Sequence, residues 1–366
     1  MIFHPGNDSF FKPEISEKQN NQMEPPIHWR SNSFLRCTEA PLQELSNPDS
    51  DPFIRVQWMD FWPQFEDCHL SRLFNDHPRI KVVNDDPDVV IGSLFGEKKQ
   101  QSCVPLLLLS WECRNRWLRS RPSSYNRWDH LFANDDLRLI PGTSHYSKKV
   151  SGIPIRMNEL LPEGNSTFSS VAPIMWNTDL LYSVARERAI KLTVETLPPK
   201  FCSFMYSNGS MSDEGAVLRQ DLFRELSKYK PVSSGGPLLN NIGSCVPRNE
   251  AAQLSFYREH KFNIAFENTR APGYTTEKIF NGLLSNSVPI YWGDPSIKEL
   301  INPEAFIWVT DVNQAVKEVI ELDTDPHKYL TKVQADPFLN GKVPPHFSRK
   351  ALNARLEELV IQLSGK

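Results

Sequence analysis

The sequence lacks an apolar run long enough to cross a membrane. Its most hydrophobic stretch, residues 104–111, is interrupted at Pro105 and is far shorter than the roughly 18 apolar residues that a span needs. The first residues lead directly into His4 and Pro5, without the charged and then apolar layout of a signal peptide. We therefore expect a cytoplasmic protein without a membrane anchor.

An excess of positive charge is also missing. The chain has 41 basic and 44 acidic residues, a net charge of -3, which excludes the broad basic surface of a nucleic-acid-binding protein. One local exception is residues 342–366, which carry five basic and two acidic side chains. A helix predicted over about 348–363 presents one apolar face, so we expect it to dock on a domain; weak peripheral membrane contact is the alternative.

Metal and cofactor motifs are absent as well. The six cysteines are scattered without a Cys-x-x-Cys pair, so we expect reduced thiols and no zinc site. No phosphate loop, G-x-G-x-x-G, H-E-x-x-H or G-x-S-x-G motif occurs. Two Asp-x-Asp triplets, at 49–51 and 323–325, lie in turn-like sequence. We predict that neither triplet holds a metal and that no cofactor is required.

What is present is an alternation of short apolar strands and helix-length polar segments. The length of 366 residues predicts two domains, and the alternation predicts an α/β fold with parallel sheets. We expect a poorly ordered lead-in, a first domain, a linker, a second domain and a final helix, at residues 1–50, 51–160, 161–178, 179–345 and 346–366. The predicted strands are 53–58, 80–83, 88–91, 104–109, 201–206, 230–233, 261–266 and 288–292, and the predicted helices of the second domain are 213–229 and 276–285.

The most informative window is residues 257–296. A strand at 262–266 runs into a polar loop, and Thr275 or Thr276 caps a helix with Glu277 and Lys278 in its first turn. Ligands of open parallel sheets bind at the carboxyl ends of strands, where helix N-termini favour anions. A lysine there is unfavourable unless an anion lies nearby. Lys278 is therefore a candidate phosphate ligand, and a solvated surface lysine is the equal alternative.

Arg219 is the second unusual placement, because it falls within the apolar stripe of the helix at 213–229. An inward-facing guanidinium needs a carboxylate or phosphate partner, whereas an arginine at the edge of the stripe extends into solvent. The turn at Gly235 and Gly236 follows a strand of the same domain. Convergence of these groups with Lys278 would suit a nucleotide diphosphate.

Glu112 is the candidate general base. It follows the buried strand at 104–109 and stands beside Trp111, a setting that can raise a carboxyl pKa toward the range useful for proton abstraction. The alternative is an ordinary ion pair with Arg114 or Arg116.

Three runs at fixed spacing, 262–268, 274–278 and 288–293, resemble the signature of the α1,3-fucosyltransferases, glycosyltransferase family 10. Weaker similarity covers residues 88–96 and 232–236, and Ser207 and Asn208 together with Arg219 resemble the donor-site helix of the family. The resemblance extends over about residues 53–340 and is strong in the second half.

The resemblance implies a GT-B fold, in which two Rossmann-like domains face a cleft. The C-terminal domain would hold GDP-fucose and the N-terminal domain an oligosaccharide or glycoconjugate acceptor. Transfer of L-fucose to the 3-hydroxyl of an N-acetylglucosamine or glucose unit would invert the anomeric centre without a metal. The donor-binding residues carried over are Ser207, Asn208, Arg219, Gly235, Gly236, Asn268, Tyr274, Glu277 and Lys278, and the catalytic ones are Glu112, Arg219, Glu277 and Lys278. A transferase for another GDP-sugar such as GDP-mannose, or a catalytically silent sugar-binding module, is the alternative.

Overall fold

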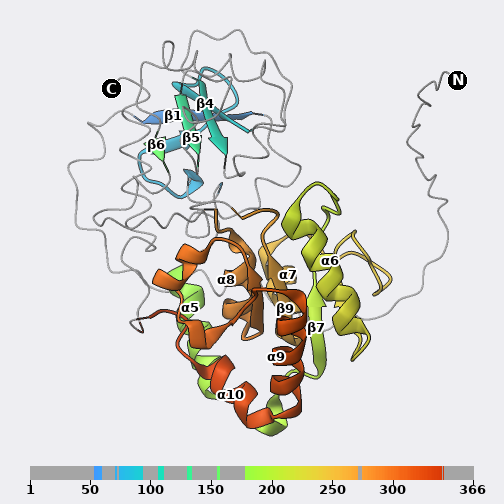
Figure 1. Cartoon of the computed structure of the whole chain (residues 1–366). Coiled ribbons are helices and arrows are strands. Elements are labelled where there is room, and N and C mark those ends of the chain that lie inside the picture. Colours follow the sequence, from blue (N-terminus) through green and yellow to red (C-terminus); the bar gives the residue numbers. More distant parts are fainter. Residues whose placement is uncertain are drawn as a thin grey trace, which may run out of the picture. The chain divides into compact units, whose positions relative to one another are not determined.

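The computed structural model of the chain describes residues 53–59, 71, 74–93, 106–110, 130–133, 155–156, 178–270, 274–339 and 341. These residues form two parallel β-sheets, which are taken separately below (Figure 1). The predicted α/β class is confirmed. The lead-in at 1–50, the final helix at 348–363 and most of the linker at 161–178 lie outside the described residues.

The first sheet has six strands in the order β2-β1-β3-β4-β5-β6, and every neighbouring pair is parallel. Val56, Val89, Val90 and Ile91 are fully buried, as is usual for the strands of a parallel sheet. The four strands predicted for this domain are confirmed to within two residues. The strands are β1 (Ile54–Met59), β2 (Ile80–Val82), β3 (Val89–Gly92), β4 (Leu106–Ser110), β5 (His130–Ala133) and β6 (Ile155–Arg156).

The second sheet has five parallel strands in the order β11-β10-β9-β7-β8. Its strands are β7 (Lys200–Phe204), β8 (Val232–Ser234), β9 (His260–Phe266), β10 (Val288–Trp292) and β11 (Ile307–Trp308). Its helices are α5 (Thr178–Ile190), α6 (Glu214–Ser227), α7 (Glu250–Arg258), α8 (Glu277–Ser285), α9 (Val312–Thr324) and α10 (Pro326–Gln334). The four strands and two helices predicted here are confirmed. No bounds were predicted for helices α5, α7, α9 and α10 or for strand β11.

Helices pack on both faces of the second sheet, as Figure 1 shows. Side chains of β9 alternate between two apolar clusters: Phe262, Ile264 and Phe266 share one with α6 and α9, and Ala265 shares the other with α7 and α8. This alternation is the two-residue period of a strand. The unit is therefore a three-layer α/β/α structure.

The strand order places a topological switch point between β7 and β9. From β7 the chain passes outward to β8, and it then returns to β9 on the other side of β7 and continues to β10 and β11. The pairing of β7 with β9 ends at Ser203 and Asn263. Beyond it the Tyr206 hydroxyl donates to the carbonyl of Ile264 at 2.8 Å and accepts the N–H of Phe266 at 2.7 Å. The switch point of such a sheet is the usual ligand-binding edge.

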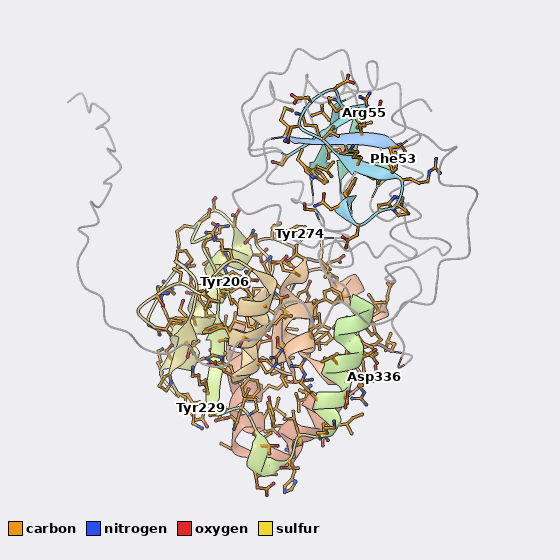
Figure 2. All side chains as sticks on the ribbon, turned by 180° about the vertical axis from the view of Figure 1, so that it is seen from behind. Phe53, Arg55, Tyr206, Tyr229, Tyr274 and Asp336 are labelled. Atoms are coloured by element: carbon orange, nitrogen blue, oxygen red, sulfur yellow. The ribbon has the colours of Figure 1, made fainter. Side chains whose placement is uncertain are left out.

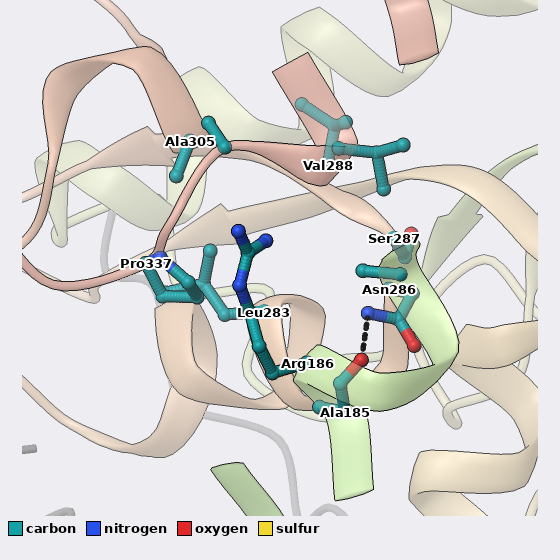
Figure 3. A pocket seen from close by; sticks show the side chains of 11 residues that line it. Ala185, Arg186, Leu283, Asn286, Ser287, Val288, Ala305 and Pro337 are labelled. Atoms are coloured by element: carbon teal, nitrogen blue, oxygen red, sulfur yellow. Dashed lines mark hydrogen bonds between the residues drawn. The ribbon is translucent and has the colours of Figure 1, made fainter. Parts of the chain in front are cut away.

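Helix α5 is hydrogen-bonded to the carboxyl end of α8. Asn286, in the left-handed conformation that ends α8, donates its side-chain amide to the carbonyl of Ala185 at 2.9 Å (Figure 3). The Tyr182 hydroxyl donates to Asp336 Oδ1 at 2.8 Å. A small pocket that includes Arg186 lies along this seam. The pocket adjoins the carboxyl end of α8. The amino end of the same helix lies at the switch point, so the pocket and the switch point are separate.

Within the part of the chain that the structure describes, every helix is too short or too polar to cross a membrane.

Candidate functional site

The first turns of α6 and α8 meet the end of β9 at the switch point. The backbone N–H of Gly215, in α6, donates to the carbonyl of Asn268 at 3.0 Å. A Cβ at Gly215 would lie 2.0 Å from the carbonyl oxygen of Glu267, so only glycine permits this approach. The backbone N–H of Thr276, at the start of α8, donates to Glu267 Oε1 at 2.7 Å. Two helix N-termini, each favourable for negative charge, are thereby directed at Glu267 and Asn268.

Arg219 extends from α6 to this point and is fully buried. Its Nη1 donates to Asn268 Oδ1 at 2.8 Å, its Nη2 donates to the carbonyl of Asn208, and its Cζ lies 3.9 Å from the centroid of the Tyr206 ring. Burial lowers the pKa of Arg219, but a guanidinium remains charged throughout the physiological range.

The partner expected for Arg219 is not a carboxylate. Among the residues the structure describes, no acidic side chain forms an ion pair with it, and its buried Nε has no hydrogen-bond partner. The two carbonyl-type oxygens and the aromatic face that surround it are neutral. The carboxylates of Glu267 and Asp213 act on it electrostatically and raise its pKa against the effect of burial, but within the described residues neither forms a direct ion pair with it.

Lys278, in contrast, has an acidic partner within the protein. Its Nζ lies 3.1 Å from Glu267 Oε2, 2.7 Å from Thr276 Oγ1 and 3.5 Å from Glu277 Oε1. Burial lowers the pKa of Lys278, but the carboxylates of Glu267 and Glu277 outweigh it and raise that pKa well above its ordinary value. Because the side chain is only 17% exposed, the interpretation as a solvated surface lysine is wrong.

Glu267 is the residue that sequence reasoning missed. Its side chain is fully buried; burial raises its pKa, while Lys278 and the hydrogen bonds from Thr276 oppose that rise. This carboxylate lies between Lys278 and the N-terminus of α8, and the predicted binding of a phosphate by Lys278 stays a prediction. Thr276 does occupy the N-cap position, but its hydroxyl donates to Glu267 at 2.8 Å instead of capping α8. The signal was the position of Glu267 directly after a buried strand.

Three other predicted donor-site residues lie around the same edge. Ser207 is exposed at the end of β7, and Asn208 donates its amide to Asp213 Oδ2 at 3.1 Å, which shapes the loop leading into α6. Tyr274 is buried, and it interacts electrostatically with both Arg219 and Lys278. Figure 2 shows Tyr206 and Tyr274 toward one end of this unit, away from Tyr229. The structure thus brings these residues together.

Gly235 and Gly236 have a packing explanation. A Cβ at Gly236 would lie 2.3 Å from the carbonyl oxygen of Tyr206, and one at Gly235 would lie 2.7 Å from Val246 Cγ2. Both glycines therefore allow the loop after β8 to pack closely on its neighbours. Their contact with a ligand stays a prediction.

The remaining acidic candidates divide into two groups. Glu112 and the triplet at 49–51 lie outside the described residues. In the triplet at 323–325, Asp323 is paired with Lys230 and Lys261, and Asp325 caps α10 by accepting from the backbone N–H groups of His327 and Lys328. The described ranges contain no cluster of three or more His, Cys, Asp or Glu side chains placed to hold a metal. The metal-free reaction stays a prediction.

Comparison with known proteins bears on the same unit. Residues 199–334 match the family model described as Glycosyltransferase family 10 (fucosyltransferase) C-term. The chain is 28% identical over 332 residues to the α-(1,3)-fucosyltransferase FucT of Helicobacter pylori, an alignment that covers 83% of this chain and 64% of the relative. It is 33% identical to the α-(1,4)-fucosyltransferase of Arabidopsis thaliana over 24% of this chain and 26% of that relative. The chain thus spans less than two thirds of the length of these curated relatives.

A solved structure gives the fold. The crystal structure of an α1,3-fucosyltransferase with GDP-fucose aligns with a TM-score of 0.54 at 21% identity, covering 87% of this chain and 93% of that chain. The chain therefore has the GT-B type of fold that its sequence predicted. The family model also confirms the resemblance to glycosyltransferase family 10 over residues 199–334.

Proposed function

We propose that the protein transfers L-fucose from GDP-fucose to a glycan acceptor, at the 3-hydroxyl of an N-acetylglucosamine or glucose unit and with inversion. The observation that carries the proposal is the buried guanidinium of Arg219, which forms no direct ion pair within the described residues and lies beside the first turns of α6 and α8. A buried cation without a direct ion pair, close to two helix N-termini, suits a phosphate-bearing ligand. The relative named for α-(1,3) transfer and the fold neighbour solved with GDP-fucose support this choice of donor and linkage.

The leaving group defines the task of the donor residues. Cleavage of the sugar–phosphate bond builds negative charge on GDP, and Lys278 with the α8 N-terminus would stabilise that charge. One preorganised contact of this kind contributes about 3–4 kcal/mol. Arg219 is wholly enclosed, so it acts through its charge and by orienting Asn208 and Asn268. The positive charge of Arg219 therefore stays at the site after GDP dissociates.

Two glutamates complete the proposed reaction. Glu277, 26% exposed in the first turn of α8, would lie on the fucose and ribose side of the diphosphate. Glu112 would take the proton of the acceptor hydroxyl as it attacks, which adds roughly 10²–10⁴-fold to the rate. No metal is assigned to any step.

Two other functions remain as alternatives to be tested. A transferase for GDP-mannose would need the same cationic diphosphate site, and a catalytically silent sugar-binding module could retain the fold. An α-(1,4) linkage is a further alternative, because one of the relatives is named for it.

The decisive experiment is a transfer assay on the full chain with N-acetyllactosamine as acceptor. GDP-fucose and GDP-mannose are supplied separately, each with and without EDTA, and the product linkage is read by NMR. We expect fucosylated product, an unchanged rate in EDTA and attachment at the 3-hydroxyl. Mannosylated product alone would replace the donor assignment. Calorimetric titration with GDP is the companion measurement: GDP binding without product would leave a binding module, and no binding would exclude every GDP-sugar transferase.

A further inference from the structure

Three donors surround the buried carboxylate of Glu267, one from the backbone at the start of α8 and two from side chains. The backbone N–H of Thr276 donates to its Oε1 at 2.7 Å, the Thr276 hydroxyl lies 2.8 Å from its Oε2, and Lys278 Nζ lies 3.1 Å from the same Oε2. The last of these donors, Lys278, would meet the leaving diphosphate in the proposed reaction.

The neighbouring strand leaves room for this carboxylate. A Cβ at Gly293, directly after β10, would lie 2.9 Å from Glu267 Cγ and 2.3 Å from the Tyr291 hydroxyl oxygen. Any larger residue at Gly293 would displace one of these two groups. The fold thus encloses Glu267 at the carboxyl edge of the sheet, at the cost of burying a charge.

Lys278 has three N–H donors, and each has an acceptor within the protein. Thr276 Oγ1 is at 2.7 Å, Glu267 Oε2 at 3.1 Å and Glu277 Oε1 at 3.5 Å. The first two fix the ammonium from the buried side. The third contact is the longest, so it is the one that a phosphate oxygen would most readily replace.

We infer that Glu267 is a positioning residue, which acts directly and through the Thr276 hydroxyl to hold Lys278 where the charge of a leaving diphosphate develops. In this relay Lys278 donates to Thr276, and Thr276 donates to Glu267. The inference rests on the proposed function for the identity of the ligand, and it assigns Glu267 no contact with substrate.

Glu267→Gln is the informative substitution because it keeps the shape and removes the charge. One end of the carboxamide is an NH₂ group, and it must face either the Thr276 N–H or the Lys278 ammonium, both of which are donors. The side chain of Lys278 then loses its fixed position. We expect kcat for fucose transfer to fall at least tenfold.

A double-mutant cycle separates positioning from simple structural support, because residues that act through one another are not additive. We expect Lys278→Ala to lower kcat at least tenfold as well, and E267Q combined with K278A to lie within twofold of K278A alone. A loss in the double variant equal to the product of the single losses would overturn the inference. The exposed pair of Lys191 and Glu187 on α5, 2.6 Å apart, is the matched control: K191A and E187Q should leave kcat unchanged.

The Thr276 hydroxyl offers a second test that leaves the Glu267 charge in place. Thr276→Val keeps the shape and the backbone N–H but interrupts the relay, so kcat should fall about threefold or more, with recovery in T276S. Wild-type kinetics in T276V would show that the Thr276 hydroxyl does not help to hold Lys278. This result can be read even if E267Q does not fold.

GDP binding, measured by calorimetry, distinguishes failure of this inference from failure of the proposed function. If the wild-type chain transfers no fucose, the proposed function is wrong, yet the cycle can still be read from the Kd for GDP. E267Q should change that Kd by at least threefold more in the wild-type background than in the K278A background. An equal change in both backgrounds would overturn the role of Glu267 whatever the sugar.

Discussion

The guanidinium carbon of Arg219 lies 3.9 Å from the centroid of the Tyr206 ring. The hydroxyl of that ring also bonds to the backbone of β9 at Ile264 and Phe266, and burial raises the pKa of Tyr206 to about 12, so it stays a neutral donor. A desolvated cation–π contact is worth about 2 kcal/mol. Tyr206 therefore bonds to the backbone of β9 and also packs against Arg219, so it helps to place this guanidinium at the end of β9.

Replacing Arg219 should affect both stability and activity. In Arg219→Ala the part-buried Asn268 Oδ1 loses its donor and the Tyr206 ring loses its cation, so we expect the unfolding free energy to fall by about 2–3 kcal/mol. The transfer rate should fall at least tenfold. Chemical denaturation and kcat/KM measure the two effects. Arg224→Ala is the control on the same helix: that side chain is exposed and paired with Asp221, and its loss should cost under about 0.5 kcal/mol without a kinetic effect.

Gly236→Ala should destabilise the protein through a backbone collision. The added Cβ would lie 2.3 Å from the Tyr206 carbonyl oxygen and 2.6 Å from its nitrogen, neither of which can move without disturbing β7. We expect a loss of about 2–3 kcal/mol, measured by thermal and chemical unfolding. Gly209→Ala meets only the flexible end of Leu238 at 2.9 Å and should lose clearly less. Equal losses in the two variants would contradict this account.

The ion pairs of Asp323 predict an acid-sensitive contribution to stability. Burial alone would raise the pKa of Asp323, but Lys230 and Lys261 outweigh it and the pKa is lowered. A lowered folded-state pKa stabilises the fold above the unfolded value, about 3.9, and this contribution is lost as the pH falls through the folded-state pKa. Asp323→Asn should lower the unfolding free energy by about 2 kcal/mol at pH 7. The difference from wild type should shrink below about pH 4; a constant difference down to pH 2 would refute the assignment.

The hydrogen bond of Tyr182 predicts a contribution to stability that is lost at alkaline pH. Burial and the hydrogen bond to Asp336 raise the pKa of Tyr182 to about 12. A raised folded-state pKa stabilises the fold fully below the unfolded value, about 10, and the contribution is lost as the pH rises toward the folded-state value. Tyr182→Phe should lower the unfolding free energy by about 1 kcal/mol at pH 8. That difference should narrow between pH 10 and the limit of measurement, whereas a difference that widens there would be inconsistent with the bond.

Eight of the eleven described strands and the helices α6 and α8 could be predicted from the sequence, because parallel strands buried on both faces are short apolar runs between breakers. No bounds were predicted for strands β5, β6 and β11 or for helices α5, α7, α9 and α10. The predicted helix boundary at Thr276 was correct, but the predicted use of its side chain was not, because a buried carboxylate competed for the hydroxyl.

Periodicity and motif spacing by themselves determined the α/β class, the family resemblance and the position of Arg219 and Lys278 near strand ends. Only the tertiary structure decided what surrounds each cation. Lys278 is paired with Glu267, eleven positions earlier, because the strand order and the first turn of α8 bring them to 3.1 Å. Arg219 has no carboxylate partner among the described residues, because α6 directs it between the neutral groups of Asn208, Asn268 and Tyr206. The partner of a buried charged side chain depends on how distant segments pack together. A local sequence pattern therefore does not reveal that partner.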